Sequence, residues 1–423
     1  MLATNATSAS RAYDPAAASP PQALVVGGRL QGLELSWLAR RAGYRVVVVD
    51  REEVVPAAGL ADACVVADVE DADALVALVL KSDIVLPALE DATALALLQE
   101  YGASVGTDVV ADLGAYAVSA SKTASNELFG QLGLPMPRPW PQCGFPVIIK
   151  PDGLSGSQGV CRADSEAELR EAAEFLGHAH QGAVVQEYLT GPSYSLEVIG
   201  NGWDYACLPV TEVCCADDHD CERIIAPAQL DAGLHGQFLH IAHSLAQRLR
   251  IDGIFDIEAI DHNGQLRLLE IDARFPSQTP ISVYCATGVN MVELLAARHV
   301  PGALARAHVQ AQEKEKAVDR DGRCCLYQQI AVCGSEVALV GEHALAHAVP
   351  LREHRGLFGA DTVISDWAPG AESWKAIVII TANTIHDAWE RYERCIQGIR
   401  IAQGTAPRCL PPRDKKVYYD ALT

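Results

Sequence analysis

Four carboxylates lie in two apolar, strand-like stretches in the second half of the chain. Asp256 and Glu258 stand two positions apart in the first stretch, and Glu270 and Asp272 stand two positions apart in the second. Because strand side chains alternate between faces, each pair shares one face of its strand. Converging carboxylates raise one another's pKa unless a cation lies among them, and an all-oxygen ligand set selects Mg²⁺ or Mn²⁺. The pattern predicts a metal site of the kind that accompanies nucleotide phosphates.

The connection between the two stretches decides whether the two acidic faces coincide. They coincide if the connection has an odd number of residues, so we expect a three-residue turn at 262–264, with Gly264 in the left-handed conformation. The alternative is a solvated acidic strand face. That alternative does not require Arg274 and the turn at 275–278 to follow immediately.

A second group of residues could hold phosphates. Lys150 ends an apolar strand and precedes a loop rich in Gly and Ser, which includes Ser155 and Ser157. Backbone N–H groups and hydroxyls of such a loop can donate to phosphoryl oxygens while the lysine supplies a fixed charge. A flexible linker is the alternative. About thirty positions later, the strand at 184–189 runs into a Gly-Pro turn and could present its backbone to a purine.

A glycine-rich turn lies near the start of the chain. Residues 27–32 read Gly-Gly-Arg-Leu-Gln-Gly between a strand and a helix pattern, and Asp50 closes the next strand. The spacing is GGxxxG rather than the dinucleotide pattern GxGxxG. Two interpretations therefore stay open: glycines that permit tight helix–strand packing, and a phosphate-binding turn.

Hydrophobic periodicity indicates the elements that must position these residues. Short apolar strands alternate with helical stretches up to about residue 115, and this alternation is typical of a doubly wound parallel sheet. Prolines between 135 and 141 mark a linker, after which a small α+β lobe begins. We expect these segments: a disordered tail at 1–21, a doubly wound domain at 22–115, a second domain at 116–320 with its small lobe at about 140–200, a C-terminal subdomain at 321–403 and a tail at 404–423.

Composition excludes several classes of protein. The 423 residues carry a formal charge of −21 without a Lys/Arg cluster, so nucleic acid is an unsuitable partner and cationic small molecules fit better. The 13 cysteines show no paired CxxC spacing, which favours reduced thiols over disulfides or zinc. No apolar run approaches the roughly 20 residues that span a bilayer, and residues 1–21 lack a signal pattern. We expect a cytoplasmic protein without membrane partners.

The order of these features resembles the ATP-grasp ligases: a lysine-ended strand with a Gly/Ser loop, then a hinge strand, then an acidic hairpin with Arg274. The resemblance implies an α/β and α+β architecture, in which a doubly wound N-terminal domain precedes two α+β ATP-binding lobes and a small C-terminal α/β subdomain. It also implies that a carboxylate attacks the γ-phosphate of ATP to form an acylphosphate, which an amine then attacks.

The resemblance assigns roles to individual residues. Phosphates would be held by Lys122, Lys150, Ser155 and Ser157, and adenine by Gln186, Glu187 and Leu189. Mg²⁺ or Mn²⁺ would be held by Glu258, Glu270 and Asp272, while Arg274, Lys150 and Asp272 would act in catalysis. Two departures stand out: the last metal position, commonly Asn in the family, is Asp272, and Pro192 and Ser193 stand where a ribose-binding acid often lies.

Within that family the chain resembles the ligases of pyrrolysine biosynthesis, which join 3-methyl-D-ornithine to the ε-amine of L-lysine. The matching segments are 27–32, 195–200, 220–221 and 270–280. Both substrates are diamino acids, so the site needs carboxylates for ammonium groups and donors for carboxylates. The first would come from Glu90, Asp91, Glu197, Glu212, Asp220 and Asp272, and the second from Arg274, Ser277 and a turn at Leu30 and Gln31. Ser195 would also bind substrate.

Several alternatives stay open. Glu90, Asp91 and Glu212 fit surface roles equally well, and Arg29 with Asp50 could bind a second nucleotide. Either Asp272 or Glu197 could take the proton of the attacking amine. The chain could also be another ATP-grasp amino-acid or dipeptide ligase, a non-catalytic nucleotide-binding module or, less consistently with the acidic hairpin, a nicotinamide-dependent oxidoreductase. A homodimer is possible.

Overall fold

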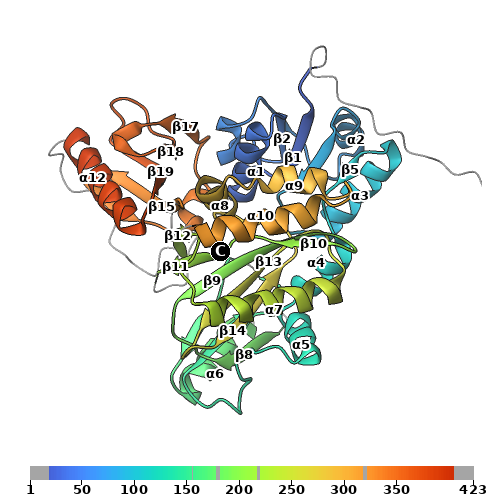
Figure 1. Cartoon of the computed structure of the whole chain (residues 1–423), viewed down its shortest axis with the longest axis vertical. Helices are drawn as coiled ribbons and strands as arrows, with labels where there is room; N and C mark the ends of the chain where they lie inside the picture. Colours follow the sequence, from blue (N-terminus) through green and yellow to red (C-terminus); the bar gives the residue numbers. More distant parts are fainter. Residues whose placement is uncertain (1–18, 155, 178–181, 217–219, 318–321, 404–423) are drawn as a thin grey trace, which may run out of the picture.

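The computed structural model describes residues 19–154, 156–177, 182–216, 220–317 and 322–403 (Figure 1). The predicted tails at 1–21 and 404–423 fall almost wholly outside these residues. The described part of the chain contains a five-stranded, an eleven-stranded and a three-stranded sheet. This mixed architecture agrees with the predicted fold class.

The N-terminal sheet is parallel, with strand order β3-β2-β1-β4-β5. Its strands are nearly continuous apolar runs because both faces are covered: Val46 and Val48 pack toward α1, while Val47 and Val49 pack toward α2 and α3. The predicted doubly wound sheet is confirmed. Its elements are β1 (Gln22–Val26), α1 (Leu30–Arg41), β2 (Arg45–Asp50), η1 (Pro56–Gly59), β3 (Ala63–Val66), α2 (Ala72–Leu80), β4 (Ile84–Pro87), α3 (Ala92–Val105) and β5 (Asp108–Val109).

Helix α1 begins earlier than the sequence pattern indicated. The apolar periodicity suggested a helix from about residue 35, and Leu30 and Gln31 were expected in the preceding turn. Both residues instead lie in the first turn of α1, which extends to Leu30 because Gly32 and Leu33 pack inside the domain. Gln31 therefore projects from a helix rather than from a loop.

The small lobe is an antiparallel three-stranded sheet with order β7-β6-β8. It lies at the bottom of Figure 1, beside α6. Two helices that precede it, α4 and α5, contact β14 (Leu266–Asp272) of the large sheet. The bounds are α4 (Leu113–Ser119), α5 (Lys122–Leu132), β6 (Val147–Pro151), β7 (Cys161–Ala163), α6 (Glu166–Gly177) and β8 (Ala183–Glu187).

The large sheet runs without interruption from the middle of the chain to its C-terminal part, in the order β14-β13-β9-β11-β12-β15-β19-β18-β17. The predicted C-terminal subdomain thus shares a sheet with the preceding domain, joined where β12 pairs with β15. The domain limits at 115 and 320 stay a proposal. The strands are β9 (Ser193–Asn201), β10 (Tyr205–Cys207), β11 (Thr211–Cys215), β12 (Cys221–Ala226), β13 (Asp252–Asp261), β14 (Leu266–Asp272), β15 (Cys324–Cys333), β16 (Glu336–Leu339), β17 (Arg352–Arg355), β18 (Thr362–Ser365) and β19 (Ser373–Ala382).

Helices cover the large sheet differently along its length. Leu196 and Val198 on one face pack with Phe238 of α7, whereas Tyr327 on the other face packs with Leu33 of α1. The face of the large sheet that carries Tyr327 therefore packs against the N-terminal domain. The remaining helices are α7 (Ala232–Leu249), α8 (Thr279–Thr287), α9 (Met291–Ala297), α10 (Ala303–Ala317), α11 (Glu342–Ala346), η2 (Leu357–Gly359) and α12 (Ile385–Gln403).

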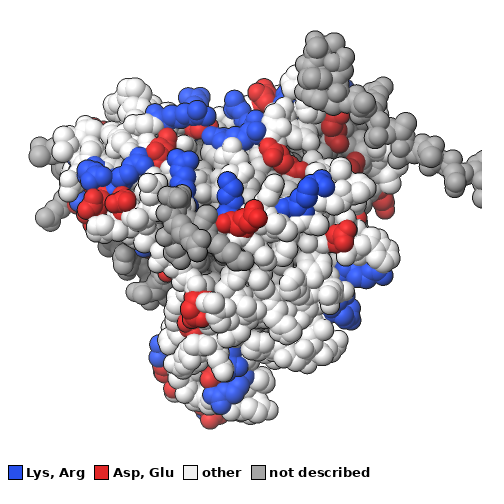
Figure 2. Space-filling model, viewed as in Figure 1, with Lys and Arg blue, Asp and Glu red and all other residues white. Residues whose placement is uncertain are grey.

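The charge distribution, the helix lengths and the cysteines of the described residues bear on the expectations from composition. On the face drawn in Figure 2, Lys and Arg are interspersed with Asp and Glu and form no unbroken basic track. Within the described residues, no single helix is long and apolar enough to cross a membrane; only α8 and α9, bent by 95° at their junction, reach that length and composition as a pair. The described cysteines are all free thiols.

Candidate active site

The hairpin that carries the four acids has a shorter turn than predicted. Asn263 and Gly264 both have positive φ, 57° and 78°, as in a two-residue type I′ turn. His262 and Gln265 close it with hydrogen bonds in both directions, 2.9 and 3.3 Å long. The three-residue turn was therefore wrong, although the left-handed Gly264 was correctly predicted.

A β-bulge nevertheless brings the acidic faces together. Asp261 pairs with Leu266, and in a regular ladder this register would put Glu270 opposite Ile257, on the wrong face. Leu269 is the extra residue of a bulge, and beyond it Glu258 pairs with Glu270. Asp256 then pairs with Asp272. All four carboxylates share one face of the sheet, as predicted. The bulge that aligns them was not predicted from the sequence pattern.

Strand β9 adds two more of the predicted residues to this face. Glu197 pairs with Asp256, and Ser195 pairs with Glu258. Glu197 is fully buried; its Oε1 accepts a 3.2 Å hydrogen bond from Ser195 Oγ. Glu212 is not brought to the site, because it pairs with Tyr194, which faces the α7 core on the opposite side of the sheet.

Two lysines reach the acidic hairpin from other elements. The Lys150 Nζ lies 3.7 Å from Glu270 Oε2, and the Lys122 Nζ lies 3.9 Å from the same oxygen. Lys122 also donates to the carbonyl of Leu154 in the Gly/Ser loop. Burial raises the pKa of Glu270, but the two lysines outweigh burial and leave that pKa below its ordinary value. Two of the predicted phosphate-binding residues, Lys122 and Lys150, therefore lie beside the predicted metal ligand Glu270.

The guanidinium group of Arg274 lies among three carboxylates. Its Nε donates to Glu90 Oε1 at 2.8 Å, and its terminal nitrogens lie 3.0 Å from Asp272 Oδ2 and 3.5 Å from Asp256 Oδ1. Burial opposes the charge, yet these carboxylates raise the pKa of Arg274 well above its ordinary value. Gln31 Nε2 donates to the same Glu90 oxygen at 2.6 Å, so the N-terminal domain contributes to this cluster.

Asp91, predicted beside Glu90, has a structural role in the described chain. Its side chain accepts a 2.8 Å hydrogen bond from the Ala94 N–H and caps the N-terminus of α3. This contact matches the surface interpretation that the sequence left open. Glu90, in contrast, faces Arg274.

The acidic face fits a divalent cation by its chemistry. Burial, together with the neighbouring carboxylates, raises the pKa of Glu258 to about 8 and that of Asp272 to about 7. Burial likewise raises the pKa of Asp256 well above its ordinary value. A cation among these oxygens would reverse the effect. Among the described residues, no group of three or more His, Cys, Asp or Glu side chains is arranged to hold a metal ion by itself, so the predicted set of Glu258, Glu270 and Asp272 stays a proposal.

The residues predicted to hold adenine lie on and after β8. Gln186 and Leu189 are buried. The carboxylate of Glu187 forms a 2.6 Å ion pair with Arg138, which lowers the pKa of Glu187, and its N–H donates to the Arg138 carbonyl. A direct contact of this side chain with adenine would require that pair to open. In the phosphate loop Ser157 has a φ of 57°, and Ser155 lies outside the described residues.

The N-terminal glycine turn is tightly packed. A Cβ on Gly32 would lie 2.0 Å from the Gly27 carbonyl oxygen, so only glycine fits there. Asp50 accepts hydrogen bonds from the N–H groups of Gly28 and Glu52, at 2.7 and 2.9 Å, and Arg29 pairs with Glu52 at 3.0 Å. These contacts support the packing interpretation and leave the second nucleotide untested.

Two carboxyls near the Ser277 turn, one buried and one half-buried, were not predicted from the sequence. Glu34 of α1 is 1% exposed, and Glu342 of α11 accepts a 3.0 Å hydrogen bond from Ser277 Oγ. A signal existed for Glu34, which occupies the apolar stripe of α1 between Leu30 and Trp37. Glu342 had no such signal, because its partners lie more than sixty positions away. The predicted Asp220 joins this group, since it accepts from the N–H of Glu342 at 3.0 Å.

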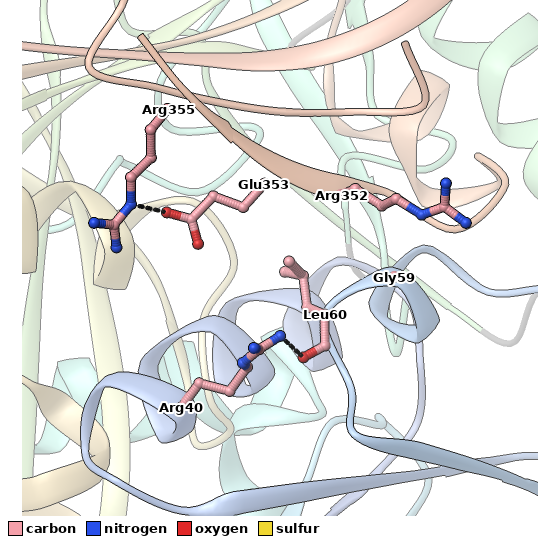
Figure 3. Close-up of a pocket in the computed structure, with 6 residues that line it drawn as sticks. All are labelled: Arg40, Gly59, Leu60, Arg352, Glu353 and Arg355. Atoms are coloured by element: carbon pink, nitrogen blue, oxygen red, sulfur yellow. Dashed lines mark hydrogen bonds and ion pairs between the residues drawn. The ribbon is translucent and has the colours of Figure 1, made fainter. Parts of the chain in front are cut away.

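A separate cavity of about 380 Å³ lies between η1 and β17 (Figure 3). Its polar groups are already partly engaged: Arg40 donates to the Leu60 carbonyl, and Arg355 pairs with Glu353. None of its lining residues belongs to the acidic hairpin or to the Arg274 cluster. The candidate active site is therefore the acidic face of β13 and β14.

Comparison with known proteins agrees with this geometry. The family model described as an ATP-grasp domain matches residues 119–278. A protein of Methanosarcina mazei named 3-methyl-D-ornithine–L-lysine ligase is 33% identical over 324 residues, which are 76% of this chain and 81% of that protein. The chain belongs to this family of ATP-grasp ligases.

Solved structures show the same fold at lower identity. The biotin carboxylase domain of the Hydrogenobacter thermophilus 2-oxoglutarate carboxylase, in complex with MgADP, has a TM-score of 0.68 at 15% identity, over 90% of both chains. An ADP complex of N5-carboxyaminoimidazole ribonucleotide synthetase has a TM-score of 0.64 at 17% identity, over 90% of this ligase and 98% of that chain. The ligase therefore has the ATP-grasp fold, and its family uses ATP and Mg²⁺.

Proposed function

We propose that this ligase joins 3-methyl-D-ornithine to the ε-amine of L-lysine in pyrrolysine biosynthesis, with ADP and phosphate as the other products. The observation that carries the proposal is the meeting of two lysines, four carboxylates and Arg274 on one sheet face. The name of the Methanosarcina mazei relative supports the choice of substrates.

The nucleotide would lie between the small lobe and the acidic hairpin. Lys122 and Lys150 would bind its phosphates, and Glu258, Glu270 and Asp272 would hold Mg²⁺. The bound metal would supply positive charge next to the transferring phosphoryl group. Both lysines already point at Glu270, so the positive charge that the phosphates require is in place before nucleotide binds.

The two amino acids would be recognised by opposite charges. Glu90, Glu197, Asp220 and Asp272 would accept hydrogen bonds from ammonium groups, and Arg274 would bind a carboxylate. Ser277 would join Arg274 through its backbone N–H, because its hydroxyl already donates its one proton to Glu342. Arg274 suits this role because its position is fixed by three acids while its side chain stays 15% exposed. Gln31, which donates to Glu90, would orient that carboxylate from the N-terminal domain.

The reaction has two steps. A carboxylate oxygen of 3-methyl-D-ornithine attacks the γ-phosphorus, the bond to the β-phosphate oxygen breaks, and ADP leaves with that electron pair. The lysine ε-amine then attacks the acyl carbon, and phosphate leaves. Arg274 and Lys150 stabilise the charge that develops on the phosphoryl oxygens.

The attacking amine must lose a proton, since a free lysine side chain has a pKa near 10.4. Two carboxyls could accept it: that of Glu197, which is fully buried, and that of Asp272, whose side chain is 20% exposed. Burial raises the pKa of Glu197 to about 7, and burial also raises the pKa of Asp272 to about 7. A base with a pKa near the working pH is the most effective, so both remain candidates, but Mg²⁺ held by Asp272 would lower the pKa of that carboxyl again and so favours Glu197.

The direct test measures ADP and product mass with ATP, Mg²⁺, 3-methyl-D-ornithine or D-ornithine, and L-lysine, omitting each amino acid in turn. The proposal predicts a condensed product and ADP only when both amino acids are present. ADP with another carboxylate–amine pair would indicate a different amino-acid or dipeptide ligase. No ADP with any amino acid would favour a nucleotide-binding module.

Two further predictions accompany this proposal. A second nucleotide at the Arg29 and Asp50 turn would double the number of ATP-analogue molecules bound per chain in calorimetry, and Arg29→Ala would remove one of them. A homodimer would appear in sedimentation at twice the mass of the chain. One binding event per chain would reject the second nucleotide. A monomer in sedimentation would reject the homodimer.

A further inference from the structure

The turn that follows Arg274 has a backbone conformation that its sequence alone does not favour. Gln278 has a φ of 74°, although it is not a glycine, and its side chain is 3% exposed. Such a conformation costs of the order of 1–3 kcal/mol and persists only where the surroundings hold it. The contacts that hold this turn therefore also set where Ser277 lies relative to Arg274.

Glu342 supplies two of these contacts. Its Oε2 accepts hydrogen bonds from Ser277 Oγ at 3.0 Å and from Gln278 Nε2 at 3.1 Å. Burial raises the pKa of Glu342. The charge of Asp220 raises it further, whereas the charge of Arg274 lowers it. One carboxyl group thus bridges two neighbouring side chains of the turn.

The backbone of Glu342 is itself fixed. Its N–H donates to Asp220 Oδ1 at 3.0 Å, and His343 Nδ1 lies 3.1 Å from the same oxygen. A Cβ on Gly341 would lie 1.9 Å from the Asp220 carboxyl, so only glycine permits this approach. The start of α11 is therefore docked on Asp220, the residue before β12, and these contacts fix the position from which the Glu342 side chain reaches the turn.

A second carboxyl holds the end of the turn from the other side. Glu34 Oε2 accepts a 2.9 Å hydrogen bond from the Ile281 N–H, and Glu34 Oε1 accepts one of 3.1 Å from Tyr327 Oη. The segment from Ser277 to Ile281 thus lies between a carboxyl of α1 and a carboxyl of α11. Both the N-terminal domain and the C-terminal part of the chain contribute to its position.

We propose that Glu342 is a positioning residue for the ligase reaction, acting through Ser277 and Gln278. This inference rests on the proposed function, in which Arg274 and Ser277 bind the carboxylate of the amino acid that is phosphorylated. Through Glu342, the C-terminal part of the chain holds the turn at the spacing from Arg274 that the carboxylate requires. Glu342 itself does not contact the substrate.

A matched series of variants separates this role from a direct contact between the Glu342 charge and a substrate ammonium group. Glu342→Gln keeps the length and one oxygen that can accept both hydrogen bonds, whereas Glu342→Asp keeps the charge but withdraws the carboxylate by one methylene. Positioning predicts that Gln is tolerated better than Asp. A charge contact predicts the reverse order.

The experiment measures KM and kcat for the carboxylate donor in wild type and in Glu342→Gln, Glu342→Asp, Glu342→Ala, Ser277→Ala and the double variant Glu342→Ala with Ser277→Ala. We expect Glu342→Ala to raise the KM of the donor about tenfold to a hundredfold, the scale of a lost hydrogen bond to a charged group. Glu342→Gln should stay within about threefold of wild type. The double variant should be no worse than Glu342→Ala, because both changes remove the same contact.

Glu353→Ala is the control. Glu353 also comes from the C-terminal part and also reaches α1, through a 2.7 Å ion pair with Arg41, but it does not touch the turn. We expect it to leave the KM of the donor unchanged, with a thermal midpoint comparable to that of Glu342→Ala. If Glu342→Ala does not fold, the order of the Gln and Asp variants and the value for Ser277→Ala still decide.

Three outcomes would overturn the inference: Asp tolerated better than Gln, additive effects in the double variant, or a KM for Glu342→Ala equal to that of Glu353→Ala. Failure of the proposed function looks different, because wild type itself would then give no condensed product. A wild type that forms the product while the variants follow one of these three patterns rejects the inference alone.

Discussion

Arg274 is the residue whose charge is paired with three carboxylates of the site. It lies among Glu90, Asp256 and Asp272, each within 3.5 Å of a guanidinium nitrogen. Such an arrangement leaves the guanidinium fixed and ready to stabilise a developing phosphoryl charge without reorganising. The acids in turn depend on it, because a buried carboxylate that loses its partner is strongly disfavoured.

Replacing Arg274 with Ala should therefore lower kcat of the condensation about 10²- to 10³-fold, the usual cost of one electrostatic stabiliser. Steady-state kinetics with both amino acids saturating would measure this. Arg267→Ala in β14 is the matched control, since Arg267 hydrogen-bonds only Gln265 in the described chain. Wild-type turnover in Arg274→Ala, with a normal thermal midpoint, would remove Arg274 from the mechanism.

Glu34 makes stability depend on pH. Burial raises the pKa of Glu34 from its ordinary value of 4.5 to about 8. Between those two values the folded chain binds more protons at this site than the unfolded chain does, so rising pH lowers the free energy of unfolding, and the loss is complete above pH 8. The groups that face Glu34 are Tyr327, which donates a hydrogen bond, and Glu197, whose charge opposes ionisation.

Glu34→Gln should abolish this dependence. The difference in unfolding free energy between wild type and Glu34→Gln should shift against wild type by up to about 1.4 kcal/mol per pH unit between pH 4.5 and 8. Urea titrations at several pH values would measure it, with Glu353→Gln as a half-buried control. A difference that stays constant across this range would show that Glu34 is ionised throughout.

The chemistry-bearing residues could be predicted because their signal is local. Asp256, Glu258, Glu270 and Asp272 interrupt apolar strands, and a charge in such a strand needs an explanation wherever the strand lies. Glu342 could not be predicted, since its role depends on a contact with Ser277, 65 positions away in the chain. Glu212 was wrongly placed in the site for a related reason. A carboxylate there suits an ammonium group, but its pairing with Tyr194 turns it to the other face of the sheet.

At the level of elements, the acidic hairpin shows where a sequence pattern reaches its limit. Alternation fixes which residues share a face within one strand, but the relation between two strands depends on the turn and on any bulge. Two departures from the predicted hairpin offset each other. The turn is one residue shorter than expected, which alone would separate the acidic faces, and the bulge at Leu269 brings them back to one face. Leu269 stands in an apolar run, and nothing in its type distinguishes it from a paired strand residue.

The left-handed conformation of Gly264 in the type I′ turn can be tested by comparing Gly264 with a glycine in a helix, Gly236 of α7. Gly264→Ala should lower the free energy of unfolding by about 1 kcal/mol, because the position has a φ of 78°, although no atom lies within 4 Å of the new Cβ. Gly236→Ala, at an exposed position in the second turn of α7 and equally free of contacts, should raise it by about 0.5–1 kcal/mol. Denaturant unfolding of both variants would check this. Equal effects would mean that the turn is not left-handed at Gly264.

At the scale of the whole molecule, one hydrophobic core joins segments that the sequence separates. Leu33 of the N-terminal domain, Phe275 beside the hairpin and Ile377 near the C-terminus belong to the same buried cluster. Proline-rich linkers and changes in periodicity predicted the order of these segments. They could not predict that the C-terminal strands extend the central sheet, because strand pairing over about a hundred residues leaves no local trace.

This shared core predicts cooperative unfolding. Calorimetry should give one main transition for the N-terminal domain, the hairpin and the C-terminal strands, and a non-hydrolysable ATP analogue with Mg²⁺ should raise its midpoint, since ligands that bind only the folded state stabilise it. Two well-separated transitions, with only one of them shifted by the nucleotide, would contradict the shared core.

The central claim is that a carboxylate of one amino acid is phosphorylated at the Arg274 site before the amine attacks. The most direct test supplies 3-methyl-D-ornithine with ¹⁸O in its carboxylate, together with ATP, Mg²⁺ and L-lysine, and measures the mass of the released phosphate. We predict one ¹⁸O in phosphate for each condensed product, with ADP as the nucleotide. Label absent from phosphate, or AMP formed in place of ADP, would contradict the account.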